Sequence, residues 1–279
     1  MKQKVCVITG ASEGIGKATL FKLAKHGMRL IAIGRNEAKL SSLAQYINTS
    51  FPGSFFEFVL ADLAQMSQVR KAASEILSRY GRIDILINNA GAYYAERNEN
   101  EEGLELTFAL NHLSYFLLTL SLLPAIESSP FARIINVSSA AHRWVNLNLN
   151  DLQMQHHYSG LLAYGRSKLM NILFTYELAE KLKDSHVTVN CLHPGFVASK
   201  FGHNNQGWIG KFFQVRQELF GVDTDKGSET STYLATSDEL NHTTGLYFKR
   251  CKPIKSSSLS YSSKLAKSLF AQSNELVFG

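Results

Sequence analysis

Short apolar runs alternate with longer segments of helical periodicity along most of the 279-residue chain. The runs rich in β-branched residues predict strands at 5–9, 30–33, 55–60, 83–87, 133–138 and 187–192. Apolar residues at helical spacing predict helices at 15–26, 37–47, 66–80, 102–123 and 161–183, with Pro124 ending the fourth. The strand runs do not alternate with polar residues, which is typical of strands buried on both faces. The pattern therefore predicts a Rossmann-like doubly wound α/β fold, a parallel sheet of about seven strands with helices on both faces.

Charge divides the chain at about residue 249. The net charge is +6, and residues 249–279 carry six basic side chains and one acid, so they hold all but one of the excess positive charges. No repeat and no Gly/Ser/Pro-rich linker separates this tail from the rest. We therefore expect one domain over 1–248, with 249–279 as its basic, solvated C-terminal extension. Contact between this extension and anionic lipid is the alternative.

Several classes of protein fit the composition poorly. Three cysteines, Cys6, Cys191 and Cys251, do not make a disulfide framework and suit a reducing, cytoplasmic compartment. The longest apolar stretch, Leu113–Ile126, is shorter than the roughly 20 residues of a membrane span, so we expect a buried helix there and no transmembrane segment. The histidines lack the spacing of a metal site, and no nucleic-acid-binding motif accompanies the basic tail. We expect no metal and no nucleic-acid partner.

The first predicted strand leads into a glycine-rich turn, Thr9-Gly-Ala-Ser-Glu-Gly-Ile-Gly16, and then into a helix. Such a turn lets a phosphate reach the free N–H groups at the helix N-terminus, because glycines leave room for close approach. The predicted cofactor contacts here are Gly10, Ser12, Glu13, Gly14, Ile15 and Gly16. The same residues fit the G-x-S-x-G elbow of serine hydrolases, with Ser12 as nucleophile. That elbow normally follows several strands, so the hydrolase is a remote alternative.

The end of the second strand bears on the choice of cofactor. In a dinucleotide-binding fold an acid at this place favours NAD, whereas an arginine accommodates the 2′-phosphate of NADP. This chain has Gly34-Arg35-Asn36 and no acid, so we expect NADP(H) to be preferred, with NAD(H) as the alternative. Glu13 weighs slightly against phosphate at this end of the site.

These residues, with others further along the chain, resemble the short-chain dehydrogenase/reductase family. The resemblance covers nearly the whole chain, and it is closest to the retinol-dehydrogenase and WW-domain-oxidoreductase-like branch. The matching segments after the glycine-rich turn are Ala61-Asp-Leu63, Asn88-Asn-Ala-Gly91, Asn111-His-Leu113, Asn136-Val-Ser-Ser-Ala-Ala-His142, Tyr164-Gly-Arg-Ser-Lys168 and His193-Pro-Gly-Phe-Val197.

The resemblance implies an oxidoreductase in which a tyrosine acts as general acid or base. Its implied catalytic residues are Asn111, Ser139, Tyr164 and Lys168, and its implied cofactor contacts beyond the turn are Asp62, Leu63, Asn89, Ala90, Gly91, Tyr164, Lys168, Pro194, Gly195 and Val197. Tyr164 and Lys168 share one helix face, and a nearby ammonium is expected to lower the pKa of the phenol. Ser139 is preferred to Ser138, because it is the second serine of the family's pair.

The segment 196–225 is rich in aromatic residues and follows a strand, where ligands of open α/β sheets bind. We expect a substrate lid there, with Tyr93, Trp144, Phe196 and Trp208 as candidate walls of an apolar pocket. The predicted function is therefore NADP(H)-dependent hydride transfer to or from a lipophilic carbonyl or alcohol of retinoid, steroid or aldehyde type. A nucleotide-binding sensor or scaffold without turnover is the alternative. Homo-oligomerisation, and peripheral membrane contact through the lid or the tail, stay open.

Overall fold

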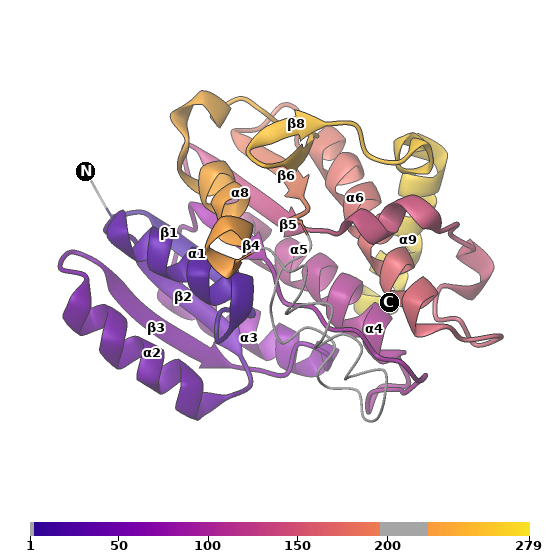
Figure 1. Ribbon diagram of the computed structural model, residues 1–279, viewed down its shortest axis with the longest axis horizontal. Coiled ribbons are helices and arrows are strands. Elements are labelled where there is room, and N and C mark those ends of the chain that lie inside the picture. Colours follow the sequence, from indigo (N-terminus) through magenta and orange to yellow (C-terminus); the bar gives the residue numbers. More distant parts are fainter. Residues whose placement is uncertain (1–2, 196–222) are drawn as a thin grey trace.

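A single twisted sheet of eight strands runs through the computed structural model, which describes residues 3–195 and 223–279 (Figure 1). The strand order is β3-β2-β1-β4-β5-β6-β7-β8, and every neighbouring pair is parallel except β7 and β8. The strands are β1 (Val5–Thr9), β2 (Arg29–Gly34), β3 (Phe55–Leu60), β4 (Ile85–Asn88), β5 (Ala132–Val137), β6 (Val187–Leu192), β7 (Tyr247–Lys249) and β8 (Lys252–Ile254). The Rossmann-like α/β prediction is confirmed, with one strand more than the expected number because the tail supplies β8.

Helices cover both faces of the sheet. One face packs against α1 (Gly14–Lys25), α2 (Glu37–Ser50) and α8 (Thr224–Thr236). The other packs against α3 (Met66–Arg79), α5 (Ser114–Glu127) and α6 (Gly160–Lys181), and α9 (Ser263–Phe278) lies outside α6 and α5. Neighbouring residues of a strand point to opposite faces of the sheet. Val7 packs on the face that α3, α5 and α6 cover, whereas Cys6 and Ile8 pack on the face that α1, α2 and α8 cover. This explains why the strand runs are apolar throughout.

The chain changes direction across the sheet between β1 and β4. Strands β1 to β3 extend to one side of this point, and β4 to β6 extend to the other. We call the space outside the carboxyl ends of β1 and β4 the crevice, because open α/β sheets bind ligands at the point where the strand order reverses. The glycine-rich turn and the loop that starts at Asn89 follow these two strand ends.

The central helix differs from its prediction at both ends. Asn100 accepts hydrogen bonds from the backbone N–H groups of Glu102 and Leu104, so this stretch forms a turn, and Glu105 caps the short helix α4 (Leu106–Phe108). A π-helical turn (Ala109–Leu113) joins α4 to α5. Pro124 lies inside α5 instead of ending it, and the turn beyond it is retained with Ala125 and Ile126 buried in the core.

The apolar character of this helix reflects its place in the core. Residues 106–127 have the length and composition of a membrane span, and they are the one such stretch among the described residues. Of its most apolar window, 72% is buried inside the protein. It packs against α3 on one side and against the sheet on the other.

The C-terminal extension is folded, so the expectation of a solvated tail is wrong. After β8 the chain forms a 3-10 turn (Ser258–Tyr261) and then α9, which packs along α6 and touches α5 (Figure 1). Ala266, Leu269 and Val277 are buried on one face of α9, while its lysines stay outside. The charge count concealed this amphipathic pattern, because the basic residues occupy only the solvent side.

Candidate active site

The glycine-rich turn packs so closely that side chains are excluded. A Cβ at Gly16 would lie 2.2 Å from the carbonyl oxygen of Gly10, and a Cβ at Gly10 would lie 2.8 Å from Cα of Ala90. Gly10 and Gly14 also have positive φ angles of 67° and 56°, which favour glycine. Ile15 and Gly16 form the first turn of α1, whose N-terminus points into the crevice.

Thr9 ties the glycine-rich turn to the loop after β4. Its hydroxyl accepts hydrogen bonds from the backbone N–H groups of Asn89 and Ala90, both at 2.9 Å. The side chain of Asn89 donates in return to the carbonyl oxygens of Thr9 (2.9 Å) and Gly10 (3.2 Å). Asn89 therefore shapes the crevice through the turn. The sequence prediction overlooked Thr9, although it opens the quoted motif.

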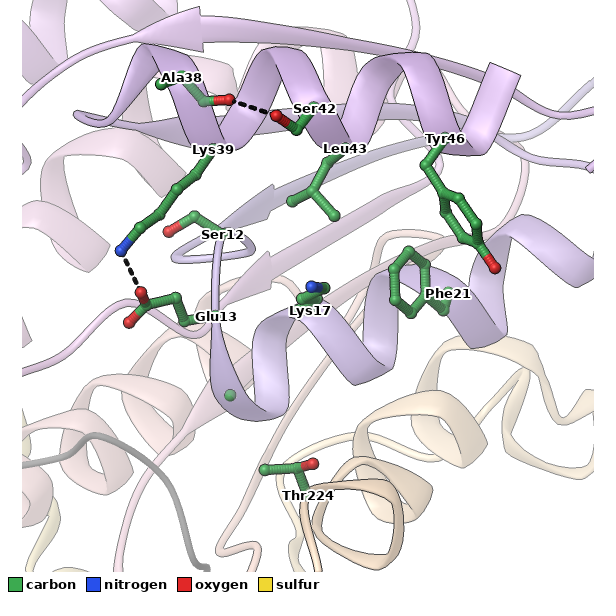
Figure 2. A pocket seen from close by; sticks show the side chains of 11 residues that line it. Ser12, Glu13, Lys17, Phe21, Ala38, Lys39, Ser42, Leu43, Tyr46 and Thr224 are labelled. Carbon is green, nitrogen blue, oxygen red and sulfur yellow. Dashed lines mark hydrogen bonds and ion pairs between the residues drawn. The ribbon is translucent and has the colours of Figure 1, made fainter. Parts of the chain in front are cut away.

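A groove of about 850 Å³ lies beside the turn, between α1 and α2 (Figure 2). Its described lining includes Ser12, Glu13 and Thr224 together with Lys39 and Ser42 of α2, but no histidine. Lys39 forms an ion pair with Glu13 across the groove. Ser12 thus faces no histidine base among the lining residues, which counts against the hydrolase. Lys39 is a basic residue that the sequence prediction did not single out.

Arg35, at the end of β2, lies against Asp62, which follows β3. The guanidinium Nη1 is 3.3 Å from Oδ2 of Asp62, and 69% of the arginine side chain is exposed. Asp62 also caps its own turn, because its Oδ1 accepts from the N–H of Ala64 at 3.0 Å, whereas Leu63 is buried. Arg35 and Asp62, both predicted to contact the cofactor, therefore lie side by side.

Ser139, Tyr164 and Lys168 come together at the carboxyl end of β5. The hydroxyl of Ser139 hydrogen bonds to the Tyr164 phenol. Lys168 donates from Nζ to the carbonyl oxygen of Val137 at 3.1 Å, and the same atom is 5.7 Å from the centroid of the Tyr164 ring. Ser138 is buried and donates to the carbonyl oxygen of Lys168 at 2.8 Å. The structure thus places Ser139 and not Ser138 beside the tyrosine.

The acid–base properties of this cluster differ from the expectation that an ammonium lowers the pKa of the phenol. Burial raises the pKa of Tyr164 to about 12, and the hydrogen bond from Ser139 offsets only part of this rise. Burial also lowers the pKa of Lys168 to about 7, since a desolvated ammonium is disfavoured. The four-residue spacing predicted that Tyr164 and Lys168 share a helix face, but it did not indicate that both side chains are buried away from solvent.

Asn111 lies in the π-helical turn and is fully buried. Its side chain accepts from the N–H of Ala92 and donates to the carbonyl oxygen of Ala92, both at 2.9 Å, and it donates to the hydroxyl of Ser167 at 3.1 Å. Asn111 therefore clamps the loop after β4 onto α6, one residue away from Lys168. Gly91 is exposed between them: a Cβ there would lie 3.2 Å from both Oδ1 of Asn111 and Nζ of Lys168.

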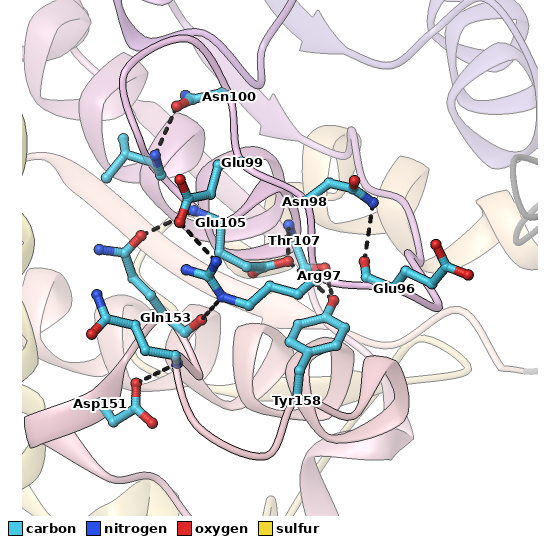
Figure 3. Close-up of polar contacts among 12 residues, drawn as sticks. Glu96, Arg97, Asn98, Glu99, Asn100, Glu105, Thr107, Asp151, Gln153 and Tyr158 are labelled. Carbon is cyan, nitrogen blue, oxygen red and sulfur yellow. Dashed lines mark hydrogen bonds and ion pairs between the residues drawn. The ribbon is translucent and has the colours of Figure 1, made fainter.

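The loops after β4 and β5 are joined by a polar cluster (Figure 3). The hydroxyl of Tyr158 donates to Oε1 of Glu105 (3.1 Å) and contacts the carbonyl oxygen of Tyr94 (3.2 Å). The N–H of Glu105 donates to Oε1 of Gln153 at 3.0 Å, and Arg97 reaches the carbonyl oxygen of the same glutamine. The cluster fixes the loop that carries Tyr93, and the sequence contained no motif that indicated it.

The remaining predicted residues occupy varied places. Tyr93 is buried beside the start of α6, whereas Trp144 is 80% exposed on the 3-10 turn after β5. Pro194 and Gly195 follow β6 at the crevice, and Gly195 has a φ of 92°. Phe196, Val197 and Trp208, with most of the proposed lid, lie outside the described residues.

Comparison with known proteins decides the family. Residues 4–209 match the family model described as short chain dehydrogenase. The chain belongs to the short-chain dehydrogenase family. It is thus an NAD(P)-dependent short-chain alcohol dehydrogenase acting on CH–OH donors, as the sequence predicted.

This short-chain dehydrogenase matches curated relatives over most of their length. It is 37% identical to mouse retinol dehydrogenase 12, with 98% of this chain and 86% of that protein covered. It is 34% identical to human polyprenol dehydrogenase, with 98% and 84% covered. An uncharacterised protein of Mycobacterium paratuberculosis, known from a crystal structure, has 29% identity and a TM-score of 0.79, with 99% and 93% covered. The resemblance to the retinol-dehydrogenase-like branch is confirmed.

Proposed function

We propose that this short-chain dehydrogenase transfers hydride between NADP(H) and a lipophilic alcohol or carbonyl compound, with Tyr164 as the proton donor and acceptor. The observation that carries the proposal is the cluster of Ser139, Tyr164 and Lys168 beside the exposed Gly91. The hydroxyls of Ser139 and Tyr164 lie together there, and the missing side chain of Gly91 leaves space next to them. The hydroxyls suit a carbonyl oxygen, and the space suits a flat ring stacked near it.

The crevice fits a dinucleotide. Gly10 and Gly16 leave the backbone of the turn open, the N-terminus of α1 suits the negative pyrophosphate, and Gly91 leaves space beside Lys168. Ser12, Gly14, Asn89 and Ala90 belong to the same two loops. The nicotinamide ring, when bound, supplies the site that gives or accepts the hydride.

The residues of the chain handle the proton and the charge. In carbonyl reduction, the hydroxyls of Ser139 and Tyr164 donate to the substrate oxygen, and Tyr164 releases its proton as negative charge develops there. A pKa of about 12 keeps this proton on the phenol at neutral pH, which favours its role as acid in reduction. Lys168, with a pKa of about 7, changes charge near neutral pH. Asn111 holds the loop at Gly91 against α6.

Two cations support the preference for NADP(H). Arg35 is mostly exposed at the crevice edge and Lys39 reaches across the groove, so both can turn toward a 2′-phosphate. Each is now paired with an acid, Asp62 or Glu13, and exposed ion pairs are weak enough for a dianionic phosphate to displace them.

We base the substrate class on the aromatic residues of the sequence and on the relatives. Retinol and polyprenol, for which two relatives are named, are lipophilic alcohols. The buried Tyr93 and the aromatic residues of 196–225 suit an apolar substrate of this kind.

A carbonyl screen with Tyr164→Phe tests the proposal. We expect the wild type to oxidise NADPH with at least one of a set of retinals, steroids, and aliphatic and aromatic aldehydes. Tyr164→Phe should lower kcat by roughly 10²- to 10⁴-fold, the usual contribution of a general acid. Tyr233→Phe, on α8, serves as the matched control and should keep its activity. Full turnover by Tyr164→Phe would refute the role of Tyr164, and tight NADPH binding without any turnover would favour the sensor.

Arg35→Asp tests the cofactor preference. The change replaces a cation with an anion at the proposed 2′-phosphate contact. We expect the ratio of NADPH to NADH affinity to fall by roughly 10- to 100-fold, as for the loss of a hydrogen bond to a charged group. The Kd values are measured by fluorescence titration, with Lys71→Asp on the surface of α3 as the control. An unchanged ratio would remove Arg35 from the cofactor site.

A further inference from the structure

His112 follows Asn111 in the π-helical turn and has no exposed surface. Its ring is surrounded by aromatic side chains: the ring centroids of Phe108, Phe116 and Phe174 lie 5.7, 6.3 and 6.4 Å away. Burial in this setting lowers the pKa of His112 to about 4, so the imidazole is neutral at physiological pH. Neither the carbonyl chemistry nor the cofactor site uses this residue directly.

Both ring nitrogens of His112 have partners on other helices. Nδ1 is 3.3 Å from Oδ1 of Asn171 on α6, and Nε2 is 2.9 Å from the hydroxyl of Ser273 on α9. The amide nitrogen of Asn171 donates to the backbone carbonyl oxygen of Asn111 at 2.9 Å. All four residues are fully buried.

These contacts determine the tautomer. Because Nδ2 of Asn171 is the donor to Asn111, its Oδ1 is the acceptor that faces His112, so the imidazole carries its hydrogen on Nδ1. Nε2 is then an acceptor, and the hydroxyl of Ser273 donates to it. The hydrogen bonds run in one direction from α9 to the carbonyl of Asn111.

We propose that Ser273, His112 and Asn171 form a chain of positioning residues through which α9 holds Asn111 in its place at the active site. This inference rests on the proposed function, because Asn111 matters only if the loop at Gly91 and Lys168 takes part in hydride transfer. It assigns to the C-terminal helix a part in catalysis that its surface charge does not suggest.

The π-helical turn explains why such support is needed. The regular spacing of backbone hydrogen bonds is interrupted there, so side chains hold the turn more than they would in an α-helix. Asn111 in turn holds both backbone groups of Ala92, and Gly91 next to it lies against Lys168. A shift of Asn111 therefore displaces the loop beside the reacting groups.

Two substitutions of His112 separate the hydrogen bond from the volume. His112→Leu removes both ring nitrogens, and we expect kcat to fall on the order of tenfold, less than the roughly hundredfold loss that an ångström of misplacement causes. The pH–rate profile should shift as well, while NADPH affinity stays at the wild-type value. His112→Asn keeps a donor at the place of Nδ1 and should recover most of kcat and the wild-type profile. Ser273→Ala should lower kcat by about threefold, since it removes only the outer link.

Leu269→Ala is the matched control on α9. Leu269 is 1% exposed and packs in the core without belonging to the chain. We expect this variant to lower Tm at least as much as Ser273→Ala does, with kcat per folded molecule and the pH–rate profile unchanged. A fall in kcat with the same shift of the pH–rate profile as in Ser273→Ala would show that the helix acts through general packing, which contradicts the proposal.

Hydrogen exchange provides a readout that needs no substrate. His112→Leu and Ser273→Ala should speed amide exchange at residues 109–113 and 91–92, whereas Leu269→Ala should not do so selectively. Wild-type kcat, pH–rate profile and exchange in His112→Leu would overturn the inference. Asn111→Ala separates this inference from the proposed function. If Asn111→Ala loses turnover while His112→Leu keeps it, the positioning role of Ser273, His112 and Asn171 is refuted and the proposed active site stands. If Asn111→Ala keeps turnover, the role of Asn111 fails, and with it the inference.

Discussion

Lys168 carries its amino group into the protein, and only 3% of the residue is exposed. Its nearest partners are the carbonyl oxygen of Val137 and the rings of Tyr115 and Tyr164, and none of these is an anion at neutral pH. The cost of desolvation therefore decides its protonation and lowers its pKa to about 7. Burying Lys168 therefore lowers the stability of the folded protein at neutral pH, and it gives the active site a lysine that changes charge near pH 7.

Lys168→Met tests this cost through its pH dependence. The folded pKa is below the unfolded value, so the folded state binds fewer protons between about pH 7 and 10.5 and gains stability as the pH rises. The variant should be more stable than the wild type at pH 7, and the difference should shrink toward pH 10 at about 1.4 kcal/mol per pH unit. Urea denaturation at several pH values measures it, with Lys71→Met as the control. Parallel stability curves would contradict the buried charge.

At the scale of elements, the turn of the β7–β8 hairpin has an unfavourable local sequence. Lys249 pairs with Lys252, so Arg250 and Cys251 form a two-residue loop. Both have positive φ angles, 49° and 60°, as in a type I′ turn, where Asn-Gly is strongly preferred. Two side chains with a Cβ in the left-handed region cost stability. The hairpin is retained because the N–H of Cys251 donates to the hydroxyl of Thr230 and because Tyr247, the first residue of β7, is buried in the protein.

Replacing the loop with Arg250→Asn and Cys251→Gly should stabilise the protein. The new residues adopt positive φ at lower cost, and the backbone bond to Thr230 is retained. We expect the free energy of unfolding to rise by roughly 1 to 2 kcal/mol. Cys251→Ala controls for the loss of the thiol and should give no such gain. A double variant that is no more stable than the wild type would show that the turn is not strained.

Across the whole molecule, neutral histidines attach residues 247–279 to the rest of the protein. His112 meets Ser273 of α9, and Nε2 of His142 accepts from the N–H of Ser257 at 3.0 Å while its Nδ1 contacts the carbonyl oxygen of Ser139 at 2.6 Å. His193 stacks on Tyr247 of β7. Burial lowers the pKa of all three, to about 4 for His112 and His193. Their protonation therefore opposes the packing of residues 247–279.

Acid should destabilise the protein between about pH 6.5 and 4. In this window the unfolded chain binds protons at these histidines and the folded chain does not, so the free energy of unfolding falls as the pH falls. Each fully shifted histidine accounts for on the order of 3 kcal/mol. Chemical denaturation of wild type and His193→Asn should show a smaller fall in the variant. The exposed His156→Asn is the control, and an equal fall in His193→Asn would contradict the prediction.

Much of the fold and part of the site could be predicted because they depend on neighbours in sequence. The apolar strands, the glycines of the turn and the four-residue spacing of Tyr164 and Lys168 are local patterns whose geometry follows from helix and strand periods. Thr9 stands in the motif and was overlooked, whereas Lys39 and the cluster around Tyr158 and Glu105 could not be found in this way. Their partners lie far along the chain, and no spacing rule relates them.

The sequence by itself determined the class of sheet, the dinucleotide turn and the family, since backbone sterics and periodicity act within a few residues. Only the tertiary structure decided the protonation of Tyr164 and Lys168, because desolvation depends on everything packed around a group. It also decided that the tail is a helix inserted against α5 and α6, where the buried His112 receives Ser273. The net charge of that segment comes from the residues on its solvent side. That its other face is buried follows only from the packing of α9 against α6 and α5.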